Sequence, residues 1–321
     1  MTLREIDHLL LGGGGAAAAA AETLRLEGEA GSILMLSAED VPPYYRPALS
    51  KQCLMGTGDA AQLDLYRPDF YVEKRIELLL NTRAVALDSA ARIVTTANGS
   101  RFRYRRLLIA TGAQPRRLGL ANEDLGGVHH LRRRADCDAV RGAITAGARR
   151  AVVVGASFLG MEIAMSLLDV GLEVTMLEAG DLVLRHLEAP EISGYFRAHA
   201  EARGVRVRMG DRPVALHGDG RIAEVETAAG LRLPCDLLMI SVGVEPASDF
   251  LAGSGVELYR GLVLVDSRLR TSAADVFAAG DITSFDDPVF ACRRHIEHWD
   301  NAMKQGRLAA RNMAGRRLRY D

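Results

Sequence analysis

The sequence feature that most constrains the fold is the stretch LLLGGGGAAAAAAET, residues 9–23. The apolar residues 6–11 predict a short strand and residues 16 to about 26 predict a helix, so the glycines form the turn between them. The spacing G-x-G-x-x-A is met by Gly12, Gly14 and Ala17. Such glycines let the backbone reverse and approach a pyrophosphate, and the small third residue lets the helix pack on the strand. The helix N-terminus adds amide N–H groups and a positive dipole end, so the stretch predicts a phosphate-binding turn.

Two other interpretations of this stretch are a low-complexity run and the apolar core of a secretory signal. A signal begins with basic residues, whereas residues 1–8 carry Glu5 and Asp7 against Arg4 alone. Four consecutive glycines would also weaken a membrane-inserting helix. No stretch reaches the roughly 18 apolar residues that a spanning helix needs. We therefore expect a cytoplasmic chain without a membrane span.

The composition agrees with an intracellular globular protein. A chain of 321 residues with 48% hydrophobic content can bury a large core and predicts about two domains. The net charge of −1 gives no global attraction for nucleic acid or membranes. The four cysteines lie far apart, with no C-x-x-C and no metal-ligand spacing: Cys53, Cys137, Cys235 and Cys292. We expect reduced thiols and no metal site.

The strand–turn–helix unit recurs in the middle of the chain. The β-branched run RAVVV (150–154) predicts a strand, and GASFLG places Gly155, Ser157 and Gly160 at the same spacing. An amphipathic helix and the strand EVTMLE (173–178) follow. In both units the second strand leads to an acid, Glu39 in the first and Glu178 in the second, of the type that accepts hydrogen bonds from ribose hydroxyls. Two such units predict an α/β protein that binds two dinucleotides.

Six motifs together carry a family resemblance. They are GGGGAAAAAAETLR (12–25), YYRPALSK (44–51), LLIATGAQPR (107–116), VVVGASFLGMEIA (152–164), VFAAGDI (276–282) and EHWDNAMKQGRLAARNM (297–313). In these motifs the chain resembles the two-dinucleotide flavoprotein reductases of the pyridine nucleotide–disulfide oxidoreductase superfamily. Within them it is most similar to the ferredoxin, rubredoxin and putidaredoxin reductases and to the apoptosis-inducing-factor-like branch.

The resemblance implies two Rossmann-like domains in three layers, with the nicotinamide domain inserted into the FAD domain. Residues 1–115 and 243–321 would form the FAD-binding domain, and residues 116–242 the NAD-binding domain. The ATG sequence at 111–113 resembles the family's exit from the FAD domain, and SVGVEP at 241–246 resembles its return.

The resemblance also implies the site residues. FAD and NADH would be bound by Gly12, Gly14, Ala17, Glu39, Arg46, Lys51, Ala110, Thr111, Gly112, Gly155, Ser157, Gly160, Glu162, Glu178, Gly243, Gly280, Asp281 and Trp299. Lys51 and Glu162 would be catalytic: Lys51 lies at the reactive edge of the flavin and pairs with Glu162, whose carboxylate is aimed at the nicotinamide. Asp281 would hydrogen-bond the ribityl chain, and Trp299 would lie beside the flavin.

Structural alternatives exist for several of these residues. Asp281 can be a helix N-cap, Lys51 a solvated surface lysine, and Trp299, the sole tryptophan, a core residue. Lysine is scarce, with 3 lysines among 40 basic residues, so the placement of Lys51 is more informative than usual. His295 and His298 lack the neighbouring ligands of a metal site and are interpreted as structural.

The expected function is an NADH-dependent FAD reductase that passes electrons singly to a ferredoxin-type iron–sulfur protein. FAD accepts two electrons together and can release them one at a time. Because the chain has no cysteine-rich cluster motif, the acceptor is another molecule. Two alternatives stay open: a disulfide or peroxide reductase that uses Cys53, and an apoptosis-inducing-factor-like interaction protein whose turnover is incidental.

Two departures from the family pattern bear on these alternatives. Lys51 occupies the register where thiol-dependent members carry a redox cysteine, and Cys53 lies two residues further on. A helix turns about 100° per residue, so this shift directs the thiol to a different face. Family members also usually continue past Tyr320 into a C-terminal interface domain, so the resemblance predicts a form without that domain, either trimmed or naturally short.

The electron acceptor is expected to be small and acidic. Five arginines lie near the end of the chain: Arg307, Arg311, Arg316, Arg317 and Arg319. Opposite charge would steer an acidic carrier toward them, and salt would weaken that encounter. The alternative is an ordinary solvated helix face. The sequence leaves the oligomeric state open.

Overall fold

The computed structural model describes residues 3–58 and 63–320. The chain divides into two compact units. The first unit comprises Met1–Tyr45, Asp64–Gln114 and Glu245–Asp321, and the second comprises Arg46–Leu63 and Pro115–Val244. The second unit is thus inserted into the first. The segment Arg46–Leu63 belongs to the second unit, whereas the sequence-based boundaries place it within residues 1–115. Strands β7 (Ala113–Pro115) and β16 (Val244–Pro246) pair where the chain passes between the units.

The first unit is built on one mixed sheet. Its parallel part has the order β3-β2-β1-β6 with β19 also paired to β6, and β5 and β4 continue antiparallel from β6. The strands are β1 (Leu3–Leu11), β2 (Ile33–Leu36), β3 (Ile76–Leu79), β4 (Ala84–Asp88), β5 (Ile93–Thr96), β6 (Arg101–Ile109) and β19 (Val276–Ala278). A smaller sheet contains β17 (Leu258–Tyr259), β18 (Leu262–Leu264), β20 (Thr283–Asp287) and β21 (Cys292–Arg294).

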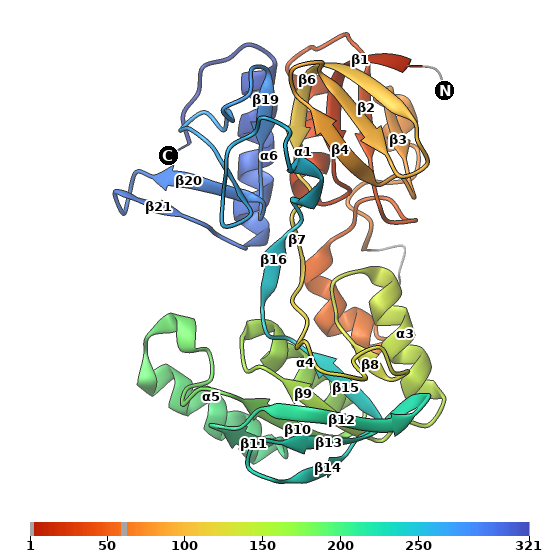
Figure 1. Cartoon of the computed structure of the whole chain (residues 1–321), viewed down its shortest axis with the longest axis vertical. Helices are drawn as coiled ribbons and strands as arrows, with labels where there is room; N and C mark the ends of the chain where they lie inside the picture. Colours follow the sequence, from red (N-terminus) through yellow and green to blue (C-terminus); the bar gives the residue numbers. More distant parts are fainter. Residues whose placement is uncertain (1–2, 59–62, 321) are drawn as a thin grey trace. The chain divides into compact units, whose positions relative to one another are not determined.

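Helices α1 (Gly15–Leu26) and α6 (Trp299–Met313) pack against each other in the first unit (Figure 1). The contact is close because residue 306 is glycine: a Cβ there would lie 2.1 Å from the carbonyl oxygen of Ala16. The alanine run of α1 is fully buried from Ala17 to Ala21. Small side chains therefore let the two helices approach, and the run is a packed helix and not a low-complexity segment. A short helix, α2 (Phe70–Glu73), precedes β3.

The second unit is also built on a parallel sheet. Its parallel sheet has the order β11-β10-β9-β15-β8, and a three-stranded sheet, β12-β13-β14, accompanies it. The strands are β8 (Val128–His129), β9 (Arg150–Val154), β10 (Glu173–Glu178), β11 (Arg206–Met209), β12 (Pro213–Asp219), β13 (Arg221–Thr227), β14 (Arg232–Pro234) and β15 (Leu237–Ile240). The helices are α3 (Arg134–Thr145), α4 (Phe158–Asp169) and α5 (Pro190–Arg203). The short segments η1 (Arg46–Ala48) and η2 (Leu49–Cys53) belong to this unit.

The predicted α/β class with two Rossmann-like folds is confirmed. In each unit a buried parallel strand leads through a glycine turn into a helix and then into the neighbouring parallel strand. Strands β2, β9 and β10 have the predicted bounds, and β1 begins three residues earlier than predicted. In the described parts of the chain, no helix has the length and apolar character needed to cross a membrane.

A charge cluster at the start of β9 has a testable pH dependence. Asp236 accepts hydrogen bonds from the Arg150 guanidinium (2.6 Å) and from the amides of Arg149 (3.1 Å) and Arg150 (2.9 Å). The Arg150 side chain is the main cause that lowers the pKa of Asp236 from 3.8 to about 2. Because the folded-state pKa is depressed, the stabilisation is present above about pH 4 and is lost as the pH falls toward 2.

We expect Asp236→Asn to lower the free energy of unfolding by about 1 kcal/mol at pH 7, a value reduced for solvent screening of this partly exposed pair. The difference from wild type should shrink below pH 4. Urea unfolding at pH 7 and pH 3 measures both values. An equal loss at both pH values would contradict the electrostatic origin.

Candidate functional site

The first glycine turn has one position where a side chain would meet only open space. A Cβ on Gly12, whose φ is +132°, would lie 2.1 Å from the carbonyl oxygen of Ala110, and one on Gly13 would lie 2.2 Å from Ser37 Oγ. Gly14 differs: it is the N-cap of α1 in an extended conformation, and no atom lies within 4 Å of its Cβ position. Gly12 and Gly13 are therefore required by the fold. At Gly14 the protein leaves space in front of a helix N-terminus that no side chain caps.

The fourth glycine of the run makes room for an indole ring. A Cβ on Gly15 would lie 2.8 Å from Trp299 Cη2. Trp299 is the first residue of α6, it is half-buried, and its ring meets Tyr45 edge-on at a centroid distance of 5.2 Å. The structure thus brings the predicted Trp299 to the start of α1, beside the Gly14 space.

Glu39 follows β2 and is half-buried. Its carboxylate accepts a hydrogen bond from the Tyr44 hydroxyl (2.8 Å), and its backbone amide donates to Ser37 Oγ (3.2 Å). A carboxylate oxygen has further lone pairs, so Glu39 retains capacity to accept hydrogen bonds from a ribose. Tyr44 is a contributor that the sequence analysis missed, although it lies in the YYRPALSK motif.

The second glycine turn repeats the geometry of the first. A Cβ on Gly155 would lie 2.2 Å from the carbonyl oxygen of Ser241, and one on Gly160 would lie 1.9 Å from the carbonyl oxygen of Gly155. Ser241 follows β15 as Ala110 follows β6, so each turn packs against the residue after the neighbouring parallel strand. Ser157 is the N-cap of α4, and its hydroxyl lies 3.5 Å from the Ser241 hydroxyl.

Glu178 ends β10 and folds back onto this turn. Its Oε2 accepts from the Ala156 amide and its Oε1 from the Gly180 amide, both at 2.8 Å. The carboxylate is therefore fixed beside the turn as an acceptor. Arg185 is close by, because its Nη1 lies 3.8 Å from the Cβ position of Gly180.

Lys51 and Glu162 form an ion pair within the second unit. Lys51 Nζ lies 2.8 Å from Glu162 Oε1 and also donates to the Pro47 carbonyl at 3.1 Å. Glu162 lies in the second turn of α4, and its other oxygen accepts from the Ser50 hydroxyl at 2.5 Å. Lys51 sits in η2, a π-helical turn interrupted at that residue (φ −120°, ψ −111°), and such turns are frequent at functional sites. The predicted pairing is thus present.

Cys53 lies in the same turn but contacts a different helix. Its Sγ accepts from Cys137 Sγ of α3 at 3.0 Å, and both side chains are buried. Burial is the main cause that raises the pKa of the Cys137 thiol well above its ordinary value. A buried thiol with a raised pKa is a poor nucleophile, and Cys53 is buried against it. This environment does not favour thiol chemistry with an external substrate.

Asp281 lies in the turn after β19 and is not at the start of a helix. His295 Nε2 donates to the Asp281 carbonyl (2.8 Å), and the preceding Gly280 amide donates to Gln305 Oε1 (2.8 Å). The fully buried Gln305 also accepts from Thr283 Oγ1 (3.0 Å). The sequence analysis missed Gln305, which holds this turn from α6. His298 Nδ1 caps α6 by accepting from the Asp300 amide.

Four of the other predicted site residues lie near the two points where the chain passes from one fold to the other, and Ala17 and Arg46 lie elsewhere. Ala110 is buried, Thr111 Oγ1 donates to the Ala247 carbonyl at 2.9 Å, and Gly112 and Gly243 have φ of +67° and +97°. Ala17 is fully buried in α1. The Arg46 guanidinium donates to the Arg132 carbonyl.

The C-terminal arginine cluster is exposed but partly paired. All five residues are solvent-exposed: Arg307, Arg311, Arg316, Arg317 and Arg319. Two of them form ion pairs with Glu27, whose carboxylate lies 3.5 Å from Arg311 and 2.9 Å from Arg316. The positive charge available to a partner is smaller than the sequence suggests.

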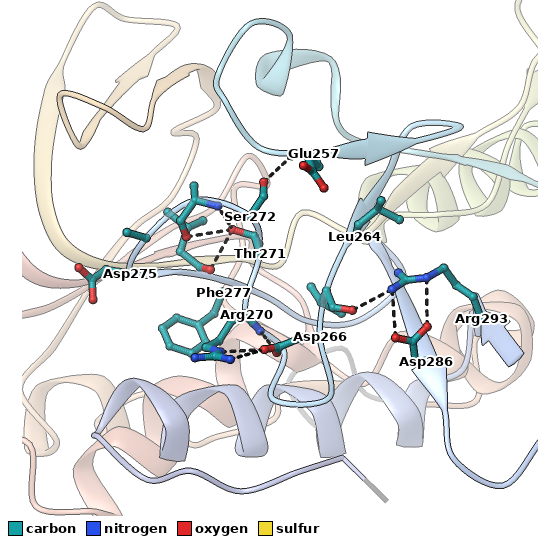
Figure 2. Close-up of a pocket in the computed structure, with 14 residues that line it drawn as sticks. Glu257, Leu264, Asp266, Arg270, Thr271, Ser272, Asp275, Phe277, Asp286 and Arg293 are labelled. Atoms are coloured by element: carbon teal, nitrogen blue, oxygen red, sulfur yellow. Dashed lines mark hydrogen bonds and ion pairs between the residues drawn. The ribbon is translucent and has the colours of Figure 1, made fainter. Parts of the chain in front are cut away.

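The first unit also has a hollow of about 600 Å³, and Figure 2 shows residues that line it. Both arginines of its lining are ion-paired, Arg270 with Asp266 (2.6 Å) and Arg293 with Asp286 (3.2 Å). Its lining contains none of the predicted site residues. Elsewhere in the described part of the chain, no cluster of three or more histidine, cysteine or acidic side chains is arranged to hold a metal ion.

Comparison with known proteins places this geometry in a family context. Residues 6–306 match the family model described as pyridine nucleotide-disulphide oxidoreductase. The chain is 35% identical over 305 residues to the biphenyl dioxygenase system ferredoxin–NAD(+) reductase component of Paraburkholderia xenovorans (strain LB400). That alignment covers 95% of this chain and 74% of the relative.

Two solved structures share the fold over 98% of this chain. The covalent putidaredoxin reductase–putidaredoxin complex gives a TM-score of 0.94 at 28% identity, with 77% of that chain covered. The NAD-dependent persulfide reductase from A. fulgidus gives 0.93 at 26% identity, with 60% covered. Because both structures are so similar, the fold alone does not distinguish an iron–sulfur acceptor from a sulfur substrate.

Proposed function

Because this chain belongs to the pyridine nucleotide-disulphide oxidoreductase family, we propose that it takes a hydride from NADH onto FAD and passes the electrons singly to a small ferredoxin-type iron–sulfur protein. The chain is an FAD-dependent NAD(P)H oxidoreductase. Bound FAD supplies the chemistry that converts a two-electron donor into one-electron steps.

The residues of the first unit fit FAD. The open space at Gly14 lies before the N-terminus of α1, where amide groups and the helix dipole favour a pyrophosphate. Glu39 supplies a carboxylate for ribose hydroxyls. We assign Asp281 to the ribityl chain and Trp299 to the neighbourhood of the flavin, and the contact of Trp299 with the start of α1 supports the latter.

The residues of the second unit fit the nicotinamide nucleotide. The turn of Gly155, Ser157 and Gly160 would face the pyrophosphate, and Glu178 would accept from the ribose 2′-OH. In this proposal Glu162 orients the nicotinamide and Lys51 places a positive charge at the flavin edge. The Lys51 ammonium would stabilise negative charge that develops there.

One observation supports an iron–sulfur acceptor over a thiol substrate. Lys51, and not a cysteine, contacts Glu162, while Cys53 is buried against Cys137. A hydride site built from a cation and a carboxylate needs no thiol. The relative from Paraburkholderia xenovorans is named a ferredoxin–NAD(+) reductase component, which supports the same acceptor class. A cytoplasmic location completes the proposal, because cytoplasmic proteins rarely carry disulfides and three of the four cysteines are buried thiols.

Anaerobic titration with NADH tests the proposal. The bound flavin should bleach with one equivalent of NADH, and an oxidised ferredoxin should restore the colour catalytically. Fast bleaching with slow reoxidation by every ferredoxin would instead favour an interaction protein. Reoxidation by a disulfide or peroxide alone would favour a thiol-type reductase.

NADH should be used at least about tenfold better than NADPH, as judged by kcat/KM. The fixed Glu178 carboxylate accepts a 2′-OH and repels a 2′-phosphate. Arg185 opposes this preference, so Arg185→Ala should widen the ratio further. A ratio of one or less in the wild type would contradict the role assigned to Glu178.

Reduction of an acidic carrier should slow as salt rises, because weaker charge attraction lowers the encounter rate. The slope should be shallow, since Glu27 pairs with Arg311 and Arg316. Reversing the free charges with Arg317→Glu and Arg319→Glu should reduce kcat/KM for the carrier and leave NADH-dependent flavin reduction unchanged. If kcat/KM for the carrier responds neither to salt nor to these substitutions, the arginine cluster is not the docking surface.

A further inference from the structure

Two residues of α4 contact two consecutive residues of η2. Glu162 and Ser166 are four residues apart and therefore share one face of the helix. The Ser166 hydroxyl donates to the Ser50 carbonyl at 2.6 Å, while the Ser50 hydroxyl donates to Glu162 Oε2 at 2.5 Å. Ser166 thus fixes the backbone of Ser50, and the side chain of Ser50 in turn binds Glu162.

The Glu162 carboxylate has a different partner on each oxygen. Ser50 occupies Oε2, and Lys51 Nζ lies 2.8 Å from Oε1. With Lys51 alone, the carboxylate could rotate about its terminal torsion, which is broad in glutamate, and still keep its ion pair. A second donor on the other oxygen removes that freedom, so the plane of the carboxylate is fixed.

The environment of Ser50 makes this hydrogen bond strong. Ser50 is 2% exposed, so its hydroxyl cannot exchange Glu162 for water at little cost. Hydrogen bonds to charged groups are also stronger than those between neutral groups. The Glu162 side chain as a whole is 35% exposed, so part of it remains accessible to a ligand.

We propose that Ser50 is a positioning residue for hydride transfer, acting through Glu162. It fixes the orientation of the carboxylate that Lys51 neutralises, and it does not itself touch the substrate. This inference rests on the proposed function.

The test is the rate of flavin reduction at saturating NADH, measured anaerobically by stopped-flow absorbance. Ser50→Ala should lower that rate about tenfold, equal to about 1.4 kcal/mol, while the KM for NADH changes less. Ser50→Cys keeps the side-chain size with a weaker donor and should fall between Ser50→Ala and wild type. The matched control is Ser193→Ala: Ser193 lies in the same unit, is also 2% exposed and donates to the Val183 carbonyl at 2.5 Å. It should reduce its flavin at the wild-type rate.

A double-mutant cycle separates positioning from simple structural support. If Ser50 acts through Glu162, removing Ser50 from a Glu162→Ala background should cost nothing further. An additive loss, or a Ser50→Ala rate equal to that of Ser193→Ala, would overturn the inference. Failure of the wild type to bleach with NADH would instead overturn the proposed function. Flavin content and melting temperature show that each variant is folded, and Ser50→Cys replaces Ser50→Ala if the latter loses its flavin.

Discussion

The Gly14→Val variant is expected to purify as a folded protein without a yellow cofactor. No atom lies within 4 Å of the Cβ position of Gly14, and its φ of −96° and ψ of −178° are accessible to valine. The side chain therefore fits the protein but occupies the space that the proposed pyrophosphate would enter. The bound flavin should fall more than about tenfold relative to wild type.

Absorbance at the flavin band against protein concentration measures this loss, with circular dichroism as the check of folding. Gly194→Val is the matched control, since Gly194 of α5 also has no atom within 4 Å of its Cβ position; it should stay yellow. Gly12→Val should fail to fold, because its Cβ would overlap the Ala110 carbonyl. A folded Gly14→Val protein with full flavin would refute the placement of FAD at this turn.

The second large effect should distinguish Lys51 from Cys53. Lys51→Ala should slow NADH-dependent reduction of a ferredoxin and of artificial one-electron acceptors by roughly tenfold to a hundredfold. The variant loses a positive charge that would stabilise the reduced flavin. Because 44% of the Lys51 side chain is exposed to solvent, which weakens its electrostatic effect, we expect a loss of activity of about tenfold. Cys53→Ser should keep nearly all of the activity, since its thiol is buried against Cys137.

The activity of each variant is compared with that of Lys74→Ala, which changes an exposed lysine of the first unit. That control should behave as wild type. Complete loss of activity in Cys53→Ser, with the flavin still bound, would favour the interpretation that the protein is a disulfide or peroxide reductase. Full activity in Lys51→Ala would remove the cation from the mechanism.

Local sequence patterns were enough to predict the two strand–turn–helix units. Each is a run of neighbouring residues in which apolar pattern, glycine spacing and helix start act over a few positions. The bounds of β2, β9 and β10 followed from the sequence for this reason, whereas the insertion of the second fold into the first was implied by the family resemblance. The pairing of Lys51 with Glu162 was reached only through the family resemblance, since the two residues are far apart in the chain.

The contacts between residues far apart in the chain could be found only from the folded structure. Ser50 and Glu162 are 112 positions apart and Cys53 and Cys137 are 84 apart, and no local period relates such residues. The same holds for the segment Arg46–Leu63, which packs with the second unit although it follows the first glycine fold. The four glycines of residues 12–15 look alike in the sequence, yet a carbonyl, a hydroxyl and an indole lie against three of them. Gly14 alone in that run faces open space, because the positions of those groups are set by strands and helices remote from the turn.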